Sequence, residues 1–231
     1  PVVTTITGPT EVCIGSTITL SNSTPGGVWS SSNNTRATVD AAGVVTGLST
    51  GVVVITYTVT NANGCSSSDN ILVTVHALPF VATLNGSTEI CAGSTSQLTC
   101  ATPGGTWSSD NTSVATVDGT GLVSGISDAT ANINYSVSNV NGCTKIRTVT
   151  VTVNAIPVLN PITGDQSICI GNTSLLENDT DGGTWSTDNN SIASVNPVTG
   201  LVTGNQAGTA TISYTVADGN GCSATVSVLV T

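Results

Sequence analysis

The sequence repeats itself with a period of 78 residues, and this periodicity limits the fold more than any other feature. Trp29, Trp107 and Trp185 lie 78 residues apart. Other residues recur in the same order, with one additional residue in the third copy: Cys13, Cys91 and Cys169; Tyr57, Tyr135 and Tyr214; Cys65, Cys143 and Cys222. Such recurrence is typical of a tandem array in which each copy is one folding unit.

Prolines mark the start of each copy, at Pro1, Pro79 and Pro157. The predicted domains therefore span residues 1–78, 79–156 and 157–231. Thr231 aligns with Thr74 inside the final apolar run of a copy. We therefore expect the last strand of the third domain to be truncated and the chain to be part of a longer array.

Each copy has the pattern of a β-sandwich. Short alternating runs rich in Thr, Val, Ser and Ile are separated by Gly, Asn and Pro, and no segment has helical spacing. The predicted class is all-β, with three tandem immunoglobulin-like sandwiches. In the first copy the predicted strands are Val3–Thr7, Ser16–Ser21, Val28–Ser31, Ala37–Val39, Val44–Thr46, Val52–Thr60 and Ile71–Val75.

Alternation along these strands predicts which side chains face the core. In the first copy they are Leu20, Trp29, Val39, Ile55, Tyr57, Val59, Ile71, Val73 and Val75, and in the second Leu98, Trp107, Val117, Ile133, Tyr135 and Val137. Each Trp, including Trp185, could instead be a platform for stacking carbohydrate. A core position is favoured because each Trp follows a tight GlyGly turn and recurs with the other core residues. Tyr214 is likewise expected to lie in the core.

Composition excludes several classes of protein. The chain has three Lys and Arg against thirteen Asp and Glu, and a formal net charge of −10. It therefore lacks the basic surface that nucleic-acid binding needs. With 38% hydrophobic and 7% charged residues it is unlike disordered chains. No apolar run is long enough to span a bilayer, so we expect no membrane insertion in this segment.

The segment that begins at each Trp resembles a known family. The strings WSSSNNTRATVDAAGVVTG, WSSDNTSVATVDGTGLVSG and WSTDNNSIASVNPVTGLVTG resemble the central signature of bacterial immunoglobulin-like domains of the second group, Big_2. The CxG and NGC motifs further resemble repeats of very large Bacteroidota surface proteins, including adhesins exported by the type IX system. The resemblance implies a non-catalytic spacer or stalk in a secreted or surface-anchored protein.

Six of the seven cysteines recur as one early and one late residue in each copy, without the close CxxC spacing of zinc sites. Disulfides are predicted, and they imply an oxidising compartment. In an Ig-like sandwich the early and late positions lie at opposite ends, roughly 20–30 Å apart along a strand. A disulfide needs Cα atoms within about 7 Å.

Head-to-tail stacking of the sandwiches into an extended rod would bring the late cysteine of one copy to the early cysteine of its neighbour. The favoured pairs are therefore Cys13–Cys143 and Cys91–Cys222, with Cys65 and Cys169 bonded to copies outside this sequence. These bonds would stiffen the joints. Bonds within one copy remain the alternative, because the predicted strand boundaries can be displaced by two to four residues.

Cys100 stands where the other copies have Asn22 and Asn178. It is predicted to be a free, partly buried thiol that points inward. A catalytic cysteine would need a histidine as its base. The single histidine, His76, lies in a linker of another copy, so catalysis by Cys100 is not expected.

No cofactor is predicted, and calcium is the weak alternative. The segment Asn178–Gly183 alternates oxygen ligands as calcium sites do, but the other copies lack its acids, so an acidic turn is favoured. Glu11 and Glu89 could join residues such as Asp218 in calcium sites at the joints. The third copy has Gln166 at the position of these glutamates.

The sequence therefore predicts a stalk or filament segment of a bacterial adhesin. Its expected partners are further copies of the repeat, with lateral association into fibres. A carbohydrate- or surface-binding module and a spacer of an extracellular hydrolase are the alternatives. The stalk is favoured over the binding module because the turns lack the aromatic residues and arginines that usually dominate binding surfaces.

Overall fold

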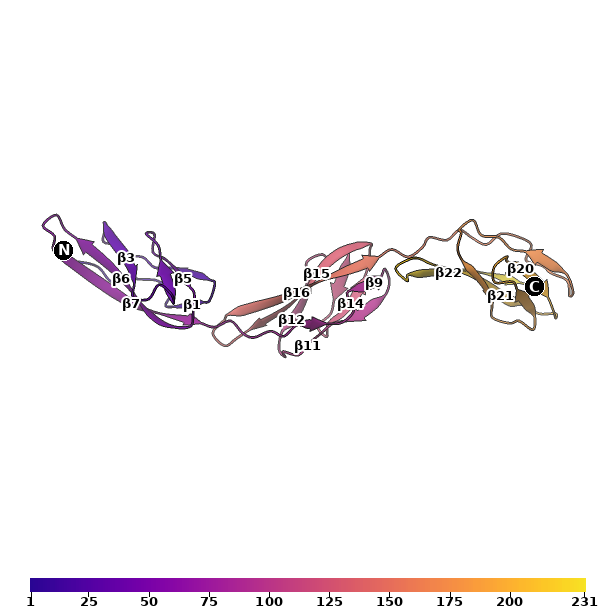
Figure 1. Cartoon of the computed structure of the whole chain (residues 1–231), viewed down its shortest axis with the longest axis horizontal. Helices are drawn as coiled ribbons and strands as arrows, with labels where there is room; N and C mark the ends of the chain where they lie inside the picture. Colours follow the sequence, from indigo (N-terminus) through magenta and orange to yellow (C-terminus); the bar gives the residue numbers. More distant parts are fainter. The chain divides into compact units, whose positions relative to one another are not determined.

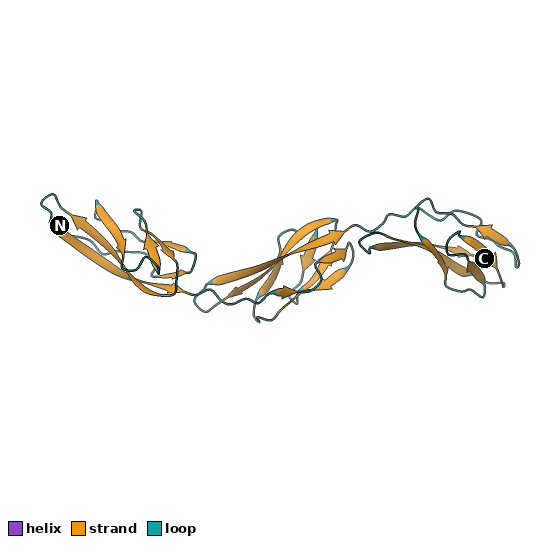
Figure 2. Ribbon diagram, viewed as in Figure 1, coloured by secondary structure: helices purple, strands orange, loops and turns teal.

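The computed structural model describes residues 1–231 and contains strands, turns and loops but no helix (Figure 2). By internal contacts the chain forms two compact units. The first comprises Pro1–Leu84, Cys100–Thr106 and Tyr135–Arg147, and the second comprises Asn85–Thr99, Trp107–Asn134 and Thr148–Thr231. Every strand of the first copy lies in the first unit, and every strand of the third copy lies in the second.

The first copy is a sandwich of two sheets around one apolar core (Figure 1). One sheet has the order β1-β7-β6-β3 and the other β2-β5-β4. The strands are β1 (Glu11–Cys13), β2 (Thr17–Thr19), β3 (Gly27–Ser31), β4 (Ala37–Val39), β5 (Val44–Gly47), β6 (Gly51–Thr60) and β7 (Ser66–His76). Between the sheets lie Ile6, Val12, Leu20, Ala37, Val45, Val53, Ile55, Tyr57, Val59, Val73 and Val75, with Trp29, Val39 and Ile71 partly buried against them.

The prediction of a first strand at Val3–Thr7 was wrong. Only Thr7 makes an isolated bridge, to Ser21, and a side-chain oxygen of Asp69 accepts the Ile6 N–H at 2.7 Å. Gly8, at φ 138°, then turns the chain. The strand forms later, as β1, which pairs in parallel with β7.

The last strand of the first copy is longer than Ile71–Val75. It begins at Ser66, and ten residues of β6 pair with β7, from Gly51↔Val75 to Thr60↔Ser66. The segment 66–70 is polar on both faces, so alternation of apolar residues could not reveal it. The tight turn after β6 brings these polar residues into register nevertheless.

The second and third copies have the same two-layer arrangement, but the third has no counterpart of the parallel edge strand β1. The second has sheets β12-β15-β16-β9, β10-β14-β13 and β11-β8, and the third has β18-β21-β22 and β17-β20-β19. The strands of the second copy are β8 (Leu84–Asn85), β9 (Glu89–Cys91), β10 (Thr95–Gln97), β11 (Thr99–Cys100), β12 (Thr106–Ser109), β13 (Ala115–Val117), β14 (Leu122–Gly125), β15 (Ala129–Ser138) and β16 (Thr144–Asn154). Those of the third are β17 (Thr173–Leu175), β18 (Thr184–Thr187), β19 (Ala193–Val195), β20 (Leu201–Gly204), β21 (Ala210–Ala217) and β22 (Ser223–Val230).

A tyrosine ties the loop before each Trp-bearing strand to the core. The Tyr57 hydroxyl donates to the Thr24 carbonyl at 2.7 Å and accepts the Gly27 N–H at 2.9 Å. Tyr135 and Tyr214 make the equivalent bonds, to Thr102 and Gly105 and to Thr180 and Gly183, at 2.6 to 2.8 Å. The buried phenol group is thereby satisfied as both donor and acceptor.

The two glycines before each Trp have different roles. Gly26 has φ +77° and open space around it, so it serves the turn, whereas Gly27 lies against the Tyr57 ring. A Cβ at Gly27 would be 2.3 Å from Cζ of Tyr57. Of the two glycines in each pair, only the first has positive φ.

We expect Gly27→Ala to destabilise the first copy by about 1–3 kcal/mol, because the new methyl group must displace a ring held by two hydrogen bonds. The matched control is Gly26→Asn, which places a residue that tolerates positive φ in open space. Thermal unfolding followed by circular dichroism compares the two variants. Equal losses would contradict the role assigned to Gly27.

The carboxylate of Asp118 organises the turn between β13 and β14. The Thr120 hydroxyl and the Leu122 N–H, with smaller contributions from other N–H groups, lower its pKa below the ordinary value of 3.8. A lowered folded-state pKa stabilises the fold above the unfolded pKa and loses this effect as pH falls through the folded pKa. Asn196 fills the corresponding turn position in the third copy and accepts N–H bonds there.

We therefore expect Asp118→Asn to lower the melting temperature at pH 7, and the difference from the unsubstituted chain to shrink as pH falls below about 4. Melting curves from pH 7 to pH 2.5 measure this difference. A difference that stays constant with pH would show that the charge of Asp118 is irrelevant to its role.

Candidate functional site

Two disulfides connect cysteines of successive copies, one in each compact unit. Cys13 is bonded to Cys143 and Cys91 to Cys222, with Cα–Cα distances of 5.6 Å in both. The bonded residues are separated by 130 and 131 positions in sequence. These are the two pairs that the sequence favours over bonds within one copy.

Strand geometry explains why Cys13 does not bond to Cys65. Cys13 lies opposite His76, the last residue of β7, whereas Cys65 directly precedes the first residue of that strand. Eleven residues of strand span about 36 Å. A disulfide requires Cα atoms within about 7 Å, so the two cysteines of one copy are held far apart by the strand between them.

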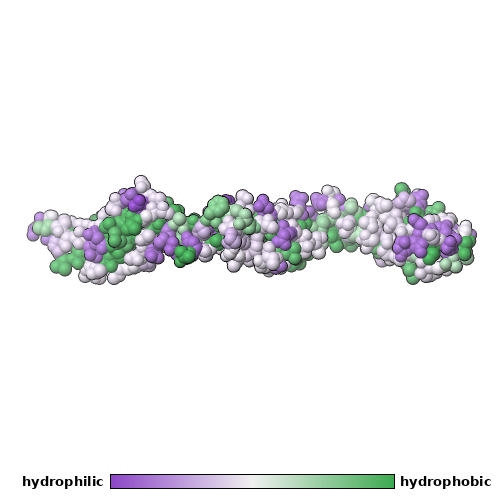
Figure 3. Space-filling model, turned by 90° about the horizontal axis from the view of Figure 1, so that it is seen from below, coloured by the Kyte–Doolittle hydropathy of each residue, from purple (hydrophilic) through white to green (hydrophobic).

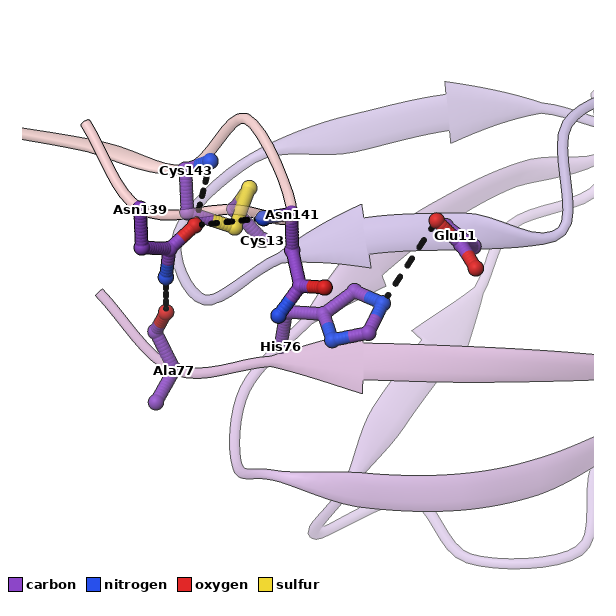
Figure 4. A network of polar contacts seen from close by, with 7 residues as sticks. All are labelled: Glu11, Cys13, His76, Ala77, Asn139, Asn141 and Cys143. Carbon is purple, nitrogen blue, oxygen red and sulfur yellow. Dashed lines mark hydrogen bonds and ion pairs between the residues drawn. A yellow bond between two sulfur atoms is a disulfide. The ribbon is translucent and has the colours of Figure 1, made fainter. Parts of the chain in front are cut away.

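A short hairpin presents Cys143 to Cys13 (Figure 4). The side-chain oxygen of Asn139 accepts the N–H groups of Asn141 at 3.1 Å and Cys143 at 3.0 Å, which closes the turn. The amide nitrogen of the same Asn139 side chain donates to the Ala77 carbonyl in the linker at 2.9 Å. One side chain thus shapes the hairpin and attaches it to the preceding linker.

His76 lies beside this disulfide, next to the linker (Figure 4). Its Nε2 is buried and makes no hydrogen bond, and it lies 3.7 Å from a carboxylate oxygen of Glu11. Both residues line a cavity of about 200 Å³ together with Cys13 and Asn141.

The disulfide of the second unit has the same hairpin with one chemical difference. The carboxylate of Asp218 accepts the Asn220 N–H at 2.9 Å and the Cys222 N–H at 2.8 Å. A carboxylate has no amide hydrogen, so it cannot donate to a linker carbonyl as Asn139 does. In both hairpins the bonded cysteine, Cys143 or Cys222, is completely buried.

The remaining three cysteines form no disulfide within the chain. Cys65 and Cys169 are exposed and have no sulfur partner in the chain. Cys100 is free and half-buried, and its thiol contacts the Ala82 carbonyl at 3.6 Å. The proposed bonds of Cys65 and Cys169 to other copies stay a prediction.

The aromatic residues lie where core packing places them. Tyr57, Tyr135 and Tyr214 are buried, Trp185 is 5% exposed, and Trp29 and Trp107 are partly buried against their cores. The ring centroids of Trp29 and Tyr57 are 4.7 Å apart, as are those of Trp185 and Tyr214. A platform for stacking sugars needs an open ring face, which Trp185 does not present.

No group of three or more His, Cys, Asp and Glu residues converges as a metal site would require. The acidic turn of the third copy instead borders an open cleft of about 650 Å³, whose lining includes Glu177, Asp179 and Asp181. At the first joint, Glu11 faces His76. The acidic side chains that the sequence suggested for calcium, in the turn 178–183 and at the joints, thus form no cluster of three or more.

The three copies match one family model. The model for the bacterial Ig-like domain, group 2, matches residues 4–77, 87–149 and 172–227, which is most of the chain. The chain belongs to this family. Ig-like repeats of this family are a non-catalytic domain type. No helix that could cross a membrane occurs in the structure.

A curated relative is Ice-binding protein 1 of Shewanella frigidimarina (strain NCIMB 400), 31% identical over 219 residues. The match covers 83% of this chain but only 23% of the relative, so the chain spans about a quarter of that protein. Among solved structures, the chain is similar to surface layer protein SbsC domains 1–6 (19% identity, TM-score 0.29, 100% of this chain and 40% of that one) and to mouse cadherin-23 EC22–24 (13%, 0.27, 95% and 93%).

We expect the double variant Cys13→Ala/Cys143→Ala to lose about 2–4 kcal/mol of stability, because the bond closes a loop of 130 residues and constrains the unfolded chain. The measurement is urea unfolding followed by tryptophan fluorescence. Cys65→Ala, which removes an exposed and unbonded thiol, is the control and should unfold like the unsubstituted chain. If the double variant unfolded at the same urea concentration as the unsubstituted chain, the prediction would be contradicted.

Proposed function

We propose that the chain is a load-bearing spacer in a secreted or cell-surface bacterial protein, the stalk or filament segment of an adhesin. Its three sandwiches lie end to end in this proposal, and the disulfides hold each joint stiff. The copies at either end use Cys65 and Cys169 to continue the same joints with neighbouring repeats. The chain itself is not an enzyme in this proposal.

The single observation that carries the proposal is that the two disulfides overlap along the chain. Cys91 lies inside the loop closed by Cys13 and Cys143, and Cys143 lies inside the loop closed by Cys91 and Cys222. The shortest covalent path from Pro1 to Thr231 runs from Cys13 to Cys143, back along the chain to Cys91, and across to Cys222. It contains about 73 residue steps, compared with 230 along the backbone.

This path limits how far the chain can be stretched. At about 3.6 Å for each residue, 73 steps give a contour of about 260 Å, whereas the reduced chain could extend to about 830 Å. Even if all three sandwiches unfolded under load, the bonded chain would lengthen to only about a third of that value. A catalytic or ligand-binding module gains nothing from this property, but a tether does.

The disulfides also support the proposed location. Structural disulfides form and persist in oxidising compartments outside the cytosol, including the periplasm and the cell surface. Membership in a bacterial Ig-like family is consistent with such a location. Export by the type IX system of Bacteroidota is part of the proposal and rests on the resemblance of the CxG and NGC motifs.

A binding module is the alternative function, and the surface gives it less support. The large exposed hydrophobic residues are aliphatic apart from Phe80, and the face drawn in Figure 3 carries both hydrophobic and hydrophilic patches. Hydroxyl groups on the outer strand faces bond to one another or to amides, as in Thr148 to Asn134 at 2.6 Å and Thr215 to Thr225 at 2.8 Å. Ice binding is named only for the relative, of which this chain covers a quarter.

Small-angle X-ray scattering of the oxidised chain tests the stalk. A single compact globule of 231 residues would have a radius of gyration of about 17 Å. We expect a value at least about twice as large, because the sandwiches lie end to end. We also expect a broader distribution of distances after reduction, because the joints then bend.

The matched control is Cys65→Ser/Cys169→Ser, which keeps both joint disulfides and should scatter like the unsubstituted chain. The variant Cys13→Ala/Cys91→Ala removes both and should scatter like the reduced chain. A radius of gyration near the compact value, with the three copies folded against one another, would overturn the stalk. That outcome would favour a spacer role in a compact enzyme or a binding module.

A further inference from the structure

The few cations of the chain are concentrated on one strand. Two of its three Lys and Arg residues, Lys145 and Arg147, lie two positions apart near the start of β16, and both are exposed. Alternation along a strand places their side chains on the same face, about 7 Å apart. The other copies have no basic residue in the corresponding segments, 66–69 and 223–226, so the fold itself does not require these cations.

These two cations are not neutralised within the chain. No lysine or arginine forms an ion pair with a carboxylate. The Lys145 side chain makes no hydrogen bond, and Arg147 uses only its Nε, which donates to the Val81 carbonyl at 3.2 Å. The terminal N–H groups of the Arg147 guanidinium are therefore available to a carboxylate, which they bind in a planar, two-point geometry.

The acidic cleft of the third copy has the complementary charge. Glu177, Asp179 and Asp181 occupy every second position of the loop that borders it, and none of the three carboxylates makes a hydrogen bond or an ion pair. This charge is also specific to one copy, because the corresponding residues of the other two carry none. They are Ser21, Ser23 and Pro25 in the first copy and Thr99, Ala101 and Pro103 in the second.

The lining of the cleft is apolar as well as acidic. Val198, which is 82% exposed, and Leu175, which is 48% exposed, line it beside the carboxylates. Val198 belongs to the turn 196–199, which is one residue longer than its counterpart 118–120. Lysine and arginine side chains combine an aliphatic stem with a charged end, so they cover apolar surface while the charge meets a carboxylate. A cleft of about 650 Å³ has room for two such side chains.

We propose that the segment Lys145–Arg147 of one molecule binds in the acidic cleft of a second copy of this chain. Two molecules with a formal net charge of −10 otherwise repel each other, so the local match of opposite charges selects this contact and orients it. Because the charged groups are exposed, the contact is weak and sensitive to salt. It requires only the second and third copies and does not depend on the stalk.

The contact is heterologous, since it joins the second copy of one molecule to the third copy of another. Each molecule carries both halves, and a heterologous contact that does not close on itself generates open assemblies. The proposal thereby assigns a specific surface to the lateral association that the sequence leads us to expect.

A charge exchange between the two surfaces tests the proposal. Lys145→Glu/Arg147→Glu reverses the segment, and Asp179→Lys/Asp181→Lys reverses the cleft. Sedimentation velocity over a range of concentrations, with the free thiols alkylated, measures self-association. Each variant alone should associate at least about tenfold more weakly than the unsubstituted chain. An equimolar mixture should regain the association, because each variant then carries the partner of the other.

Net charge provides the matched control. Asp179→Lys/Asp181→Lys makes the formal net charge less negative than −10, and Glu89→Lys/Asp128→Lys on the second copy changes it by the same amount. If overall repulsion governed association, both variants would associate more strongly than the unsubstituted chain. We expect no loss of association in the Glu89/Asp128 variant and a loss in the Asp179/Asp181 variant. An equal gain in both, or a mixture of the reversed variants that stays monomeric, would overturn the proposal.

Lys145 is the single lysine of the chain, which allows the contact to be mapped directly. A carbodiimide joins a carboxylate to a lysine amine when the two groups are in contact. In the unsubstituted chain we expect a cross-linked dimer in which Lys145 is bonded to Glu177, Asp179 or Asp181. Dimers cross-linked mainly at other carboxylates would contradict the assigned surface. Scattering of the dilute monomer tests the stalk separately, so failure of one proposal leaves the other measurable.

Discussion

The length of the β6–β7 hairpin is the constraint on which the rest of the molecule depends. The hairpin pairs ten residues of β6 with β7 and runs from Cys65 at one end to the strand partner of Cys13 at the other. No disulfide can cross the resulting distance of about 36 Å. Each cysteine is therefore available only to a neighbouring copy, and the same spacing in every copy makes the joint repeatable.

The core supports this arrangement because it buries the inner faces of the long strands. In each copy a tyrosine from β6, β15 or β21 packs its ring on a glycine and bonds the loop before the tryptophan strand through its hydroxyl group. Buried apolar residues dominate, and no polar or charged residue is fully buried.

The two joints are built alike but are not identical. Asn139 connects its hairpin to the linker, whereas Asp218 shapes its hairpin without an amide group to donate. The contact between His76 and Glu11 occurs only at the first joint, because Asn154 takes the place of the histidine at the second, although Glu89 keeps the glutamate. Both joints share the disulfide and the side-chain oxygen that closes the hairpin, whereas the contact to the linker differs.

The sequence by itself determined the period, the all-β class, most core positions and the candidate disulfide partners, because buried apolar residues and cysteines recur at fixed intervals. It could not locate β1 or the polar first half of β7, since strand pairing there is imposed by the neighbouring strand and the turn and not by apolar alternation. It also could not separate the two roles of the paired glycines, because the contact with Tyr57 joins residues 30 positions apart. Only the tertiary structure decided how far apart the two cysteines of one copy lie. That distance depends on the length of β7 and on which of its residues pairs with Cys13.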